Sequence, residues 1–241
     1  SMSTENELQK LIPHQKLLHS LQTTTPENGK KNVIVLSTGS LCPVHLMHRE
    51  MVEVAIAHLE STNNYNVLAG FLSPSQDVYV GTKLGPKAID AKHRLHMVNL
   101  ICEDSEKVST SSWEAMKPGC FVDYPSVVKY HQKYFNEILP ESLPEIRPFL
   151  PINVVYVCGS DHASRCSMFG LKRTGVVVVP RPGIKPQECE KFKEHYEVPE
   201  LELKDVSSTL IRNKLANHQP LEELCGEAVS AYLYKLFKYP E

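Results

Sequence analysis

The chain has 241 residues, which is enough for one large α/β domain or two small ones. Its content of 41% hydrophobic and 22% charged residues is ordinary for a soluble globular protein. The formal net charge of −2 argues against a general affinity for nucleic acid or an anionic membrane. Any phosphate binding therefore has to come from a local group of donors.

Cysteine usage and hydropathy indicate the compartment. The seven cysteines are scattered without C-x-x-C spacing, and their odd number does not suggest a disulfide framework. No stretch approaches the length of a membrane span, and no charged-then-apolar signal peptide opens the chain. We therefore expect a cytoplasmic and/or nuclear protein with no nucleic-acid partner and no membrane partner.

Residues 1–31 are expected to form an N-terminal helix and a linker, and residues 32–241 a single domain. Leucines at helical spacing are interrupted by Pro13, and Pro26 and Gly29 mark the polar linker. We expect this helix to pack on the outside of a sheet.

The stretch from Lys31 to Glu60 organises the rest of the chain. Its apolar run from Val33 to Leu36 is typical of a buried parallel strand. Small residues follow, and a helical pattern then runs from about His45 to Leu59. A strand, a turn of small residues and a helix point backbone N–H groups at the turn, which favours an anion such as phosphate. His45 and His48 share a face of the helix and can both hydrogen-bond one anionic group.

The residues Gly39 to His48 resemble the signature G-[ST]-x-x-P-x-H-x-x-H of the nucleotidyltransferase superfamily. Within it they are most similar to the nicotinamide mononucleotide adenylyltransferases. The resemblance implies phosphate contacts from Gly39 and Ser40 and catalytic roles for His45 and His48. It also implies contact between Ser40 and the mononucleotide. In the alternative interpretation, one histidine caps the helix and the other packs against the sheet.

Further elements follow from apolar runs and helical periodicity. The expected strands are residues 65–72, 108–111, 153–158, 176–179 and 201–203, and the expected helices begin near residues 90, 124, 208 and 222. The helix from residue 124 is expected to reach Leu139, and the closing helix to run from Glu222 to Tyr239. Four prolines between residues 140 and 151 predict a stiff connection.

Two segments resemble the acceptor side of the family. Residues 73–79 are similar to its S-P-x-x-D-x-Y segment, and the glycine-rich loop expected over residues 80–86 holds Lys83, a candidate ligand for the mononucleotide phosphate. Trp113, the only tryptophan, follows a predicted strand as in the family's W-E pair, in which the indole packs against the nicotinamide ring. A core tryptophan is the alternative. The pair His93-Arg94 also recurs in the family, and we interpret it as structural.

Two turns resemble the part of the family's site that binds adenosine. Gly159-Ser160-Asp161 is similar to its G-[AS]-D triplet, in which Gly159 permits close approach by the adenosine. Asp161 accepts hydrogen bonds from the adenosine or helps to order the site. Arg181 to Gly183 is similar to its R-x-G. Met168-Phe169 is a candidate replacement for a nicotinamide-flanking pair of the family.

The C-terminal signature, residues 205–212, resembles the family's [IV]-S-S-T-x-I-R. Ser207, Ser208 or Thr209 can cap the helix that begins there, and the same hydroxyl and N–H groups can hold phosphate oxygens. Arg212, one turn into the helix, offers a fork of donors suited to phosphate and is assigned a catalytic role. The alternative is an ordinary helix cap followed by a solvated arginine.

The alternation of strands and helices predicts an α/β fold with a Rossmann-like, open and mostly parallel sheet, helices on both faces, as in nucleotidyltransferases. Right-handed crossovers bring the carboxyl ends of the strands to one edge. We expect the residues of the two signatures to lie together with Trp113 and Asp161 in one crevice at that edge.

The resemblance implies that the adenylyl group of ATP passes to nicotinamide or nicotinate mononucleotide, giving NAD or its acid analogue and pyrophosphate. Mg²⁺ would be held by ATP phosphates and water, with no metal ligands expected from the protein. The resemblance alone suggests a homo-oligomer. Three alternatives stay open: a transferase with another phosphate acceptor, a non-catalytic nucleotide-binding protein, and a slow nucleotide pyrophosphatase. Sequence does not decide between amide and acid mononucleotides.

Overall fold

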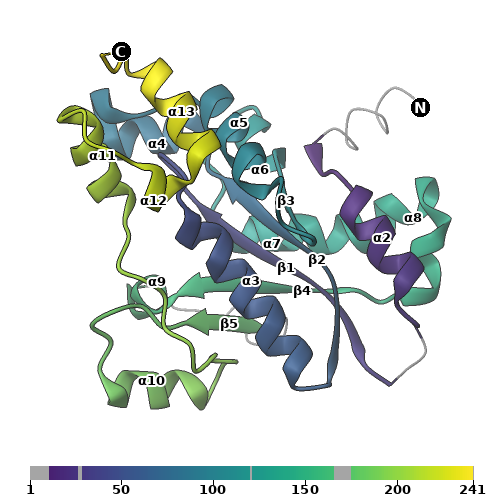
Figure 1. The fold of residues 1–241 in the computed structure, drawn as a ribbon. Helices are drawn as coiled ribbons and strands as arrows, with labels where there is room; N and C mark the ends of the chain where they lie inside the picture. The colour runs from purple at the N-terminus through teal and green to yellow at the C-terminus, as the bar shows by residue number, and fades with distance from the viewer. Residues whose placement is uncertain (1–10, 27–28, 120, 166–174, 241) are drawn as a thin grey trace.

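A parallel sheet forms the centre of the computed structural model, which describes residues 11–26, 29–119, 121–165 and 175–240 (Figure 1). Its five strands lie in the order β3-β2-β1-β4-β5, and all neighbouring pairs are parallel. The strands are β1 (Lys31–Gly39), β2 (Tyr65–Pro74), β3 (Val108–Thr110), β4 (Asn153–Gly159) and β5 (Val176–Val179). The predicted open, parallel α/β sheet is confirmed.

Both faces of the sheet are covered by helices. Side chains alternate along each buried strand, so each strand contributes to the apolar core on both faces. In β1, Val33 and Val35 join one apolar core, while Ile34 and Leu36 join the other. The first core contains residues of α3 (Leu46–Ser61), α4 (Asp77–Leu84), α5 (Ala91–Cys102), α11 (Ser208–Ala216), α12 (Glu222–Cys225) and α13 (Glu227–Leu236). Figure 1 shows α3 in front of the sheet and α7 (Tyr124–Lys133) behind it.

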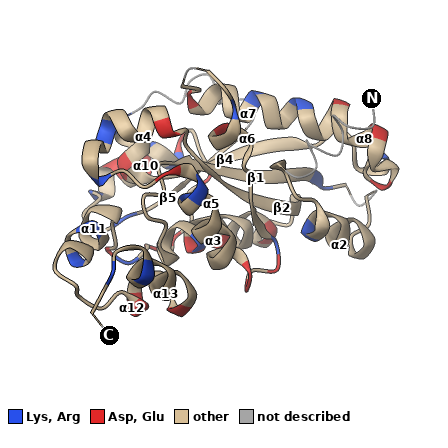
Figure 2. Cartoon of the chain, turned by 90° about the horizontal axis from the view of Figure 1, so that it is seen from above, with Lys and Arg blue, Asp and Glu red and all other residues tan. Residues whose placement is uncertain are grey.

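The second core lies on the α7 face. Its helices, besides α7, are α2 (Gln15–Thr23), α6 (Trp113–Met116), α8 (Leu139–Ser142), α9 (Ser160–Arg165) and α10 (Pro186–Lys193). Figure 2 shows basic and acidic residues interspersed along the helices, in keeping with the small net charge. Within the described ranges, no helix is both long and apolar enough to cross a lipid bilayer.

The strand order reverses beside β1. The chain passes from β1 to β2 and β3 on one side, then returns to β4 and β5 on the other. In open α/β sheets, ligands bind outside the carboxyl ends of the strands at such a point. Gly39 ends β1 and Gly159 ends β4, so residues of both neighbouring strand ends are brought to this crevice.

Close packing of α3 on the sheet fixes the position of the helix beside that crevice. A Cβ atom on Gly70 of β2 would lie 2.9 Å from Cγ1 of Val52 and 3.0 Å from Cγ2 of Val35. Because protein cores are densely packed, a side chain here would push α3 off the sheet. The glycine therefore allows the middle of α3 to pack closely on β1 and β2.

The segment around α2 lies against the outer edge of β3. The Nζ of Lys16 donates hydrogen bonds to the carbonyl oxygens of Cys102, at 2.7 Å, and Val108, at 2.5 Å. The N–H of Ser112 donates to the carbonyl of Leu11 at 2.7 Å. Residues before β1 are thereby fastened to the end of α5 and to the edge strand.

Several predicted elements differ in the structure. The strand predicted over residues 201–203 is wrong: this segment is irregular, and Leu203 donates one backbone hydrogen bond to the Pro180 carbonyl at 3.1 Å. The loop predicted over residues 80–86 is also wrong, because α4 continues to Leu84 and a 3₁₀ turn, Gly85–Lys87, follows. Val80 anchors α4 in the core, and this burial outweighs the low helix propensity of Gly81.

Two predicted helices are interrupted. After α7 the chain forms a π-helical turn, Tyr134–Ile138, before α8 begins, and a 3₁₀ segment, Pro144–Phe149, occupies the proline-rich connection. The closing helix is divided into α12 and α13 by Gly226, whose φ of 76° breaks the helical path.

Candidate active site

The two histidines of the first signature lie together at the start of α3. His45 precedes the helix with an extended backbone, and its N–H donates a hydrogen bond of 3.0 Å to Nδ1 of His48. The two imidazole rings stack with centroids 3.7 Å apart. Because Nδ1 of His48 accepts, the proton of its neutral form sits on Nε2, which can donate to a ligand.

Both histidines are neutral at pH 7 in the ligand-free protein. Burial, followed by the positive charge of Arg181, lowers the pKa of His48 well below its usual range, and Asp161 opposes this shift. Burial, followed by His48 and Arg181, lowers the pKa of His45 as well. An incoming anion therefore first meets neutral imidazole rings as hydrogen-bond donors and not charged imidazolium rings.

The C-terminal signature is tied directly to the first one. The hydroxyl of Ser208 donates to the Pro43 carbonyl at 2.9 Å. One guanidinium nitrogen of Arg212 donates to the Cys42 carbonyl at 2.8 Å, and another to Oγ1 of Thr209 at 3.1 Å. Ser207 caps α11 by accepting a hydrogen bond from the N–H of Leu210 at 3.1 Å. Segments more than 160 residues apart thus form one wall.

A cavity of about 230 Å³ lies between these segments and the end of β1. Among the predicted site residues, it is lined by Gly39, Ser40, His48, Lys83, Ser208, Thr209 and Arg212. Two buried polar atoms at this turn, Oγ of Ser40 and Nδ1 of His45, have no hydrogen-bond partner within the described residues. Buried polar atoms normally find partners, so these atoms are suited to a bound ligand.

Gly159 and Asp161 lie on the β4 side of the histidines. A Cβ atom on Gly159 would meet Oδ1 of Asp161 at 2.6 Å and Cδ of Arg181 at 2.9 Å. The lack of a side chain at Gly159 therefore has a structural explanation that involves no ligand. It makes room for two charged side chains beside His48.

Arg181 is a site residue to which the sequence analysis assigned no role. Its N–H donates to Oγ of Ser160 at 2.9 Å, and its guanidinium donates to the Val206 carbonyl at 2.7 Å. Its charge lowers the pKa of both histidines, so it lies within electrostatic range of them. The resemblance of residues 181–183 to the family's R-x-G was the sequence signal that could have identified this arginine.

Trp113 is placed apart from the cavity. Its indole stacks on the ring of Tyr130 with centroids 3.8 Å apart and an interplanar angle of 8°. The Nζ of Lys117 lies 4.9 Å from the centroid of the same ring system. The tryptophan lines a separate hollow along α7, so the expected gathering of all site residues in one crevice is incomplete.

An aromatic group at the ends of β1 and β4 was not predicted. The hydroxyl of Tyr156 lies 3.0 Å from Oγ1 of Thr38 and 3.4 Å from Nε2 of His162, and the ring of Tyr124 stacks on Tyr156 at 5.0 Å. Lys83 contributes to the lowered pKa of His162, although burial is the largest cause. Met168-Phe169, the predicted pair, lies outside the described residues.

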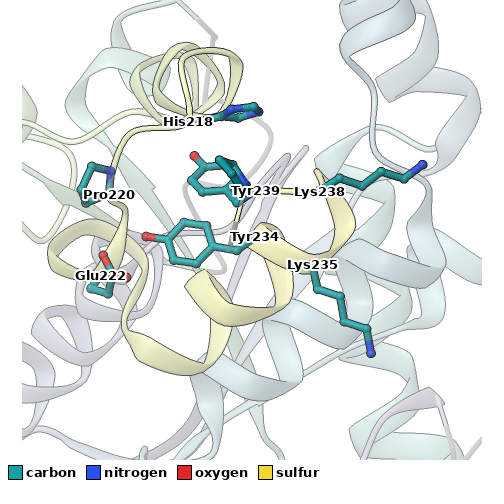
Figure 3. Close-up of a pocket in the computed structure, with 8 residues that line it drawn as sticks. His218, Pro220, Glu222, Tyr234, Lys235, Lys238 and Tyr239 are labelled. Atoms are coloured by element: carbon teal, nitrogen blue, oxygen red, sulfur yellow. The ribbon is translucent and has the colours of Figure 1, made fainter.

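A further hollow of about 630 Å³ lies at the C-terminal end of the chain and holds none of the predicted site residues (Figure 3). Its wall includes Tyr234 and Tyr239, whose rings stack at 4.3 Å. The Tyr239 hydroxyl donates to the Gln219 carbonyl at 2.9 Å and lies 3.3 Å from the Lys214 carbonyl of α11. This end of the chain therefore buttresses α11, the helix that carries Arg212.

The chain is similar in sequence to several known adenylyltransferases. A nicotinamide/nicotinic acid mononucleotide adenylyltransferase from Oryza sativa subsp. japonica is 28% identical over 236 residues, covering 88% of this chain and 89% of the relative. One of the same name with the suffix 1, from Bos taurus, is 24% identical and covers 87% and 89%. A Drosophila melanogaster nicotinamide-nucleotide adenylyltransferase is 26% identical, covering 86% of this chain and 61% of the relative.

The fold has similar solved structures. A Plasmodium falciparum nicotinic acid mononucleotide adenylyltransferase complexed with APC superposes with a TM-score of 0.57 at 13% identity, covering 87% of this chain and 98% of that one. The family model for cytidylyltransferase-like proteins matches residues 36–214, a span that contains the H-x-x-H turn and the S-S-T-x-I-R helix start. The chain therefore belongs to the cytidylyltransferase-like family.

Proposed function

We propose that the protein transfers the adenylyl group of ATP to nicotinamide mononucleotide or nicotinate mononucleotide, releasing pyrophosphate. The single observation that carries the proposal is the cavity bounded by both signatures, with His48 and Arg212 on its walls. The names of the relatives, which are adenylyltransferases for these two mononucleotides, support the choice of acceptor.

In the proposed reaction, a phosphate oxygen of the mononucleotide attacks the α-phosphorus of ATP. A new P–O bond forms as the bond from the α-phosphorus to the bridging oxygen of pyrophosphate breaks. No protein nucleophile is needed, because the attacking phosphate is already an anion. The protein contributes alignment of the two substrates and stabilisation of charge on the phosphates.

For the polyphosphate we assign the N–H groups of the turn, the Nε2–H of His48 and the free donors of Arg212. Two guanidinium nitrogens of Arg212 already bond to the Cys42 carbonyl and Thr209, and this fixes the plane in which its other N–H groups point. Binding an anion beside the two histidines raises their pKa values, so negative charge and imidazolium charge would develop together. His45, Ser207, Ser208 and Thr209 complete this group.

For the adenosine we assign Gly159 and Asp161, and for the mononucleotide Ser40, Lys83 and Trp113. Oγ of Ser40 has no partner in the described residues and is buried in the turn, so it is suited to a phosphate oxygen. Tyr130 covers one face of the Trp113 indole, and in this proposal the pyridine ring takes the place of Tyr130 on that face. The acceptor side is therefore assembled on binding.

Mg²⁺ would be brought by ATP, with phosphate oxygens and water as its ligands. Within the described ranges, no group of three or more His, Cys, Asp or Glu side chains could hold a metal ion. The donor set at the cavity is instead cationic and neutral, which fits a ligand that carries its own metal. When bound, the ion would withdraw charge from the phosphates.

The test is product analysis of the purified protein incubated with ATP and Mg²⁺, with either nicotinamide or nicotinate mononucleotide. NAD or its acid analogue supports the proposal, and the ratio of the two rates reports the head-group preference. AMP alone would indicate a pyrophosphatase, and a conjugate formed only with another phosphate would indicate a different acceptor. ATP binding without product from any acceptor would leave a non-catalytic nucleotide-binding protein.

A further inference from the structure

Arg94 is a fully buried arginine whose guanidinium bonds to three segments, one of which is the turn between β1 and α3, residues 40–45 (the phosphate turn). Its side chain is 0% exposed. Nε donates to the Ile89 carbonyl at 2.7 Å, and one terminal nitrogen donates to the Ser40 carbonyl at 2.8 Å. The other terminal nitrogen donates to Oδ1 of Asp77 at 3.0 Å. The sequence predicted a structural role for the His93-Arg94 pair, and the structure gives Arg94 a buried one that includes the turn after β1.

The Ser40 carbonyl is one of three in this turn that are held from outside. Arg212 holds the Cys42 carbonyl and Ser208 holds the Pro43 carbonyl, as described above. In a planar trans peptide, the N–H of the next residue points opposite to the carbonyl. Binding the Ser40 carbonyl to Arg94 therefore fixes the direction of the Leu41 N–H, and Leu41 lines the cavity.

The backbone of this turn needs such restraint. Leu41 has a φ of 46°, in the left-handed region that non-glycine residues rarely occupy. Such a conformation persists only where surrounding contacts over-determine it. The hydrogen bond from Arg94 acts on the peptide group immediately before Leu41, so it is in place to supply that restraint.

Asp77 connects the same arginine to the acceptor side. Its Oδ1 accepts from Arg94 and also from the N–H of Ala91, at 2.7 Å, where α5 begins. Asp77 is the first residue of α4, and Lys83 in the last turn of α4 lines the cavity. One guanidinium thus joins the phosphate turn to the helix that carries Lys83.

We propose that Arg94 and Asp77 form a positioning pair, which sets the phosphate turn against α4 and so controls the binding of both substrates without touching either. A buried guanidinium is costly unless its donors are well paired, and an apolar side chain would fill this core space at lower cost. The guanidinium fixes the Ser40 carbonyl and the Asp77 carboxylate relative to each other, which an apolar side chain cannot do. The part that concerns the mononucleotide rests on the proposed function.

The test compares Arg94→Lys with the matched control Arg49→Lys. Lysine keeps the charge but cannot bond to Ser40 and Asp77 as a planar fork. Arg49, which follows His48 in α3, also donates to a carbonyl in this core, that of Ile101 at 2.7 Å at the end of α5, and not to a carbonyl of the turn. Binding of ATP is measured by calorimetry, together with the melting temperature and the KM for each substrate.

We expect Arg94→Lys to weaken ATP binding by about tenfold, in line with the loss of well-aligned charge-assisted bonds. It should also raise KM for the mononucleotide. Because Arg94 is 0% exposed and Arg49 is 23% exposed, Arg94→Lys should lose more stability, so binding is compared well below both melting temperatures. Unchanged ATP binding in folded Arg94→Lys would overturn the proposal. So would equal losses of binding in both variants.

Asp77→Asn keeps the test open if Arg94→Lys does not fold. The Asp77 side chain is 54% exposed, and asparagine retains an acceptor oxygen, so the variant should fold. We expect a rise of a few fold in KM for the mononucleotide, with a smaller change for ATP. An unchanged KM would refute the link to α4. If the wild-type protein forms no dinucleotide, ATP binding by Arg94→Lys still tests the turn, so the two proposals fail separately.

Discussion

The two halves of the site are built to different degrees in the ligand-free protein. On the phosphate side, three carbonyls of one turn are held by side chains from α5 and α11, and two histidines are stacked in place. On the acceptor side, Lys83 lies on a short helix, and Trp113 is stacked on Tyr130 away from the cavity. Under the proposed function, this difference predicts a preorganised phosphate cradle, formed by the turn after β1 and the start of α11, and an acceptor pocket that forms as its ligand enters.

The largest effect is expected from the cradle. His48→Ala and Arg212→Ala should each lower kcat by about a hundredfold or more, since preorganised donors to a transition state contribute on that scale. In the described part of the chain the His48 ring accepts one backbone hydrogen bond and stacks on His45, so the melting temperature of His48→Ala should fall modestly while turnover is lost. Steady-state kinetics beside a melting curve measure both, and full turnover in either folded variant would remove that residue from the catalytic group.

A smaller effect is expected at Gly159. In Gly159→Ala the new Cβ would displace the carboxylate of Asp161, which lies 2.6 Å from that position. Because a side-chain end can move, we expect KM for ATP to rise by about tenfold while the fold survives.

Gly81→Ala is the matched control for Gly159→Ala, because nothing described lies within 4 Å of its Cβ position. It should leave KM for ATP unchanged. A Gly159→Ala variant with normal ATP kinetics would show that Asp161 is not a nucleotide ligand.

Trp113 sharpens the comparison further. If the indole leaves Tyr130 to stack on the pyridine ring, Trp113→Ala should raise KM for the mononucleotide by about tenfold, the size of one stacking interaction. KM for ATP should stay constant. Tyr130→Ala serves as the control because it removes the same intramolecular stack but no ligand contact. Equal effects of the two substitutions would mean that the tryptophan is structural.

A separate effect concerns pH and stability and not turnover. Burial raises the pKa of Glu114 to about 8, and the hydrogen bond from Ser73 at 2.9 Å only partly opposes this. The folded state then binds a proton that the unfolded state has already released, so stability falls as pH rises from the unfolded pKa of about 4.5 toward 8. Melting temperatures from pH 5 to pH 9 should fall more steeply for wild type than for Glu114→Gln. Parallel curves would show that this carboxyl keeps an ordinary pKa.

Much of this architecture could be predicted from sequence because the strands are short apolar runs followed by small residues. The turn after Leu36 and the serines before α11 were identified for the same reason, since cap and turn residues have local signatures. The strand predicted over residues 201–203 was wrong because alternating Leu and Glu imitates a strand, whereas within the described ranges the segment makes the single backbone bond from Leu203 to Pro180 that is described above.

The less predictable features depend on contacts between distant segments. Nothing in the periodicity around Arg94 indicates that its guanidinium reaches Ser40, 54 residues away. Likewise, the sequence near Trp113 does not indicate that Tyr130 covers its ring. Gly159 was expected to admit adenosine, but its immediate steric neighbours are Asp161 and Arg181. These three contacts depend on the tertiary structure, which local sequence patterns do not determine.

The contacts of Lys16 have a consequence for solubility. A short strand at the border of a sheet exposes unpaired backbone groups that can recruit another chain. Val108 pairs with β2 on its inner side, and its outward carbonyl is covered by the Lys16 ammonium, while the neighbouring Ser112 N–H is taken by Leu11. The residues ahead of β1 thereby cover the edge of β3, which disfavours the pairing of β3 with a strand of another molecule.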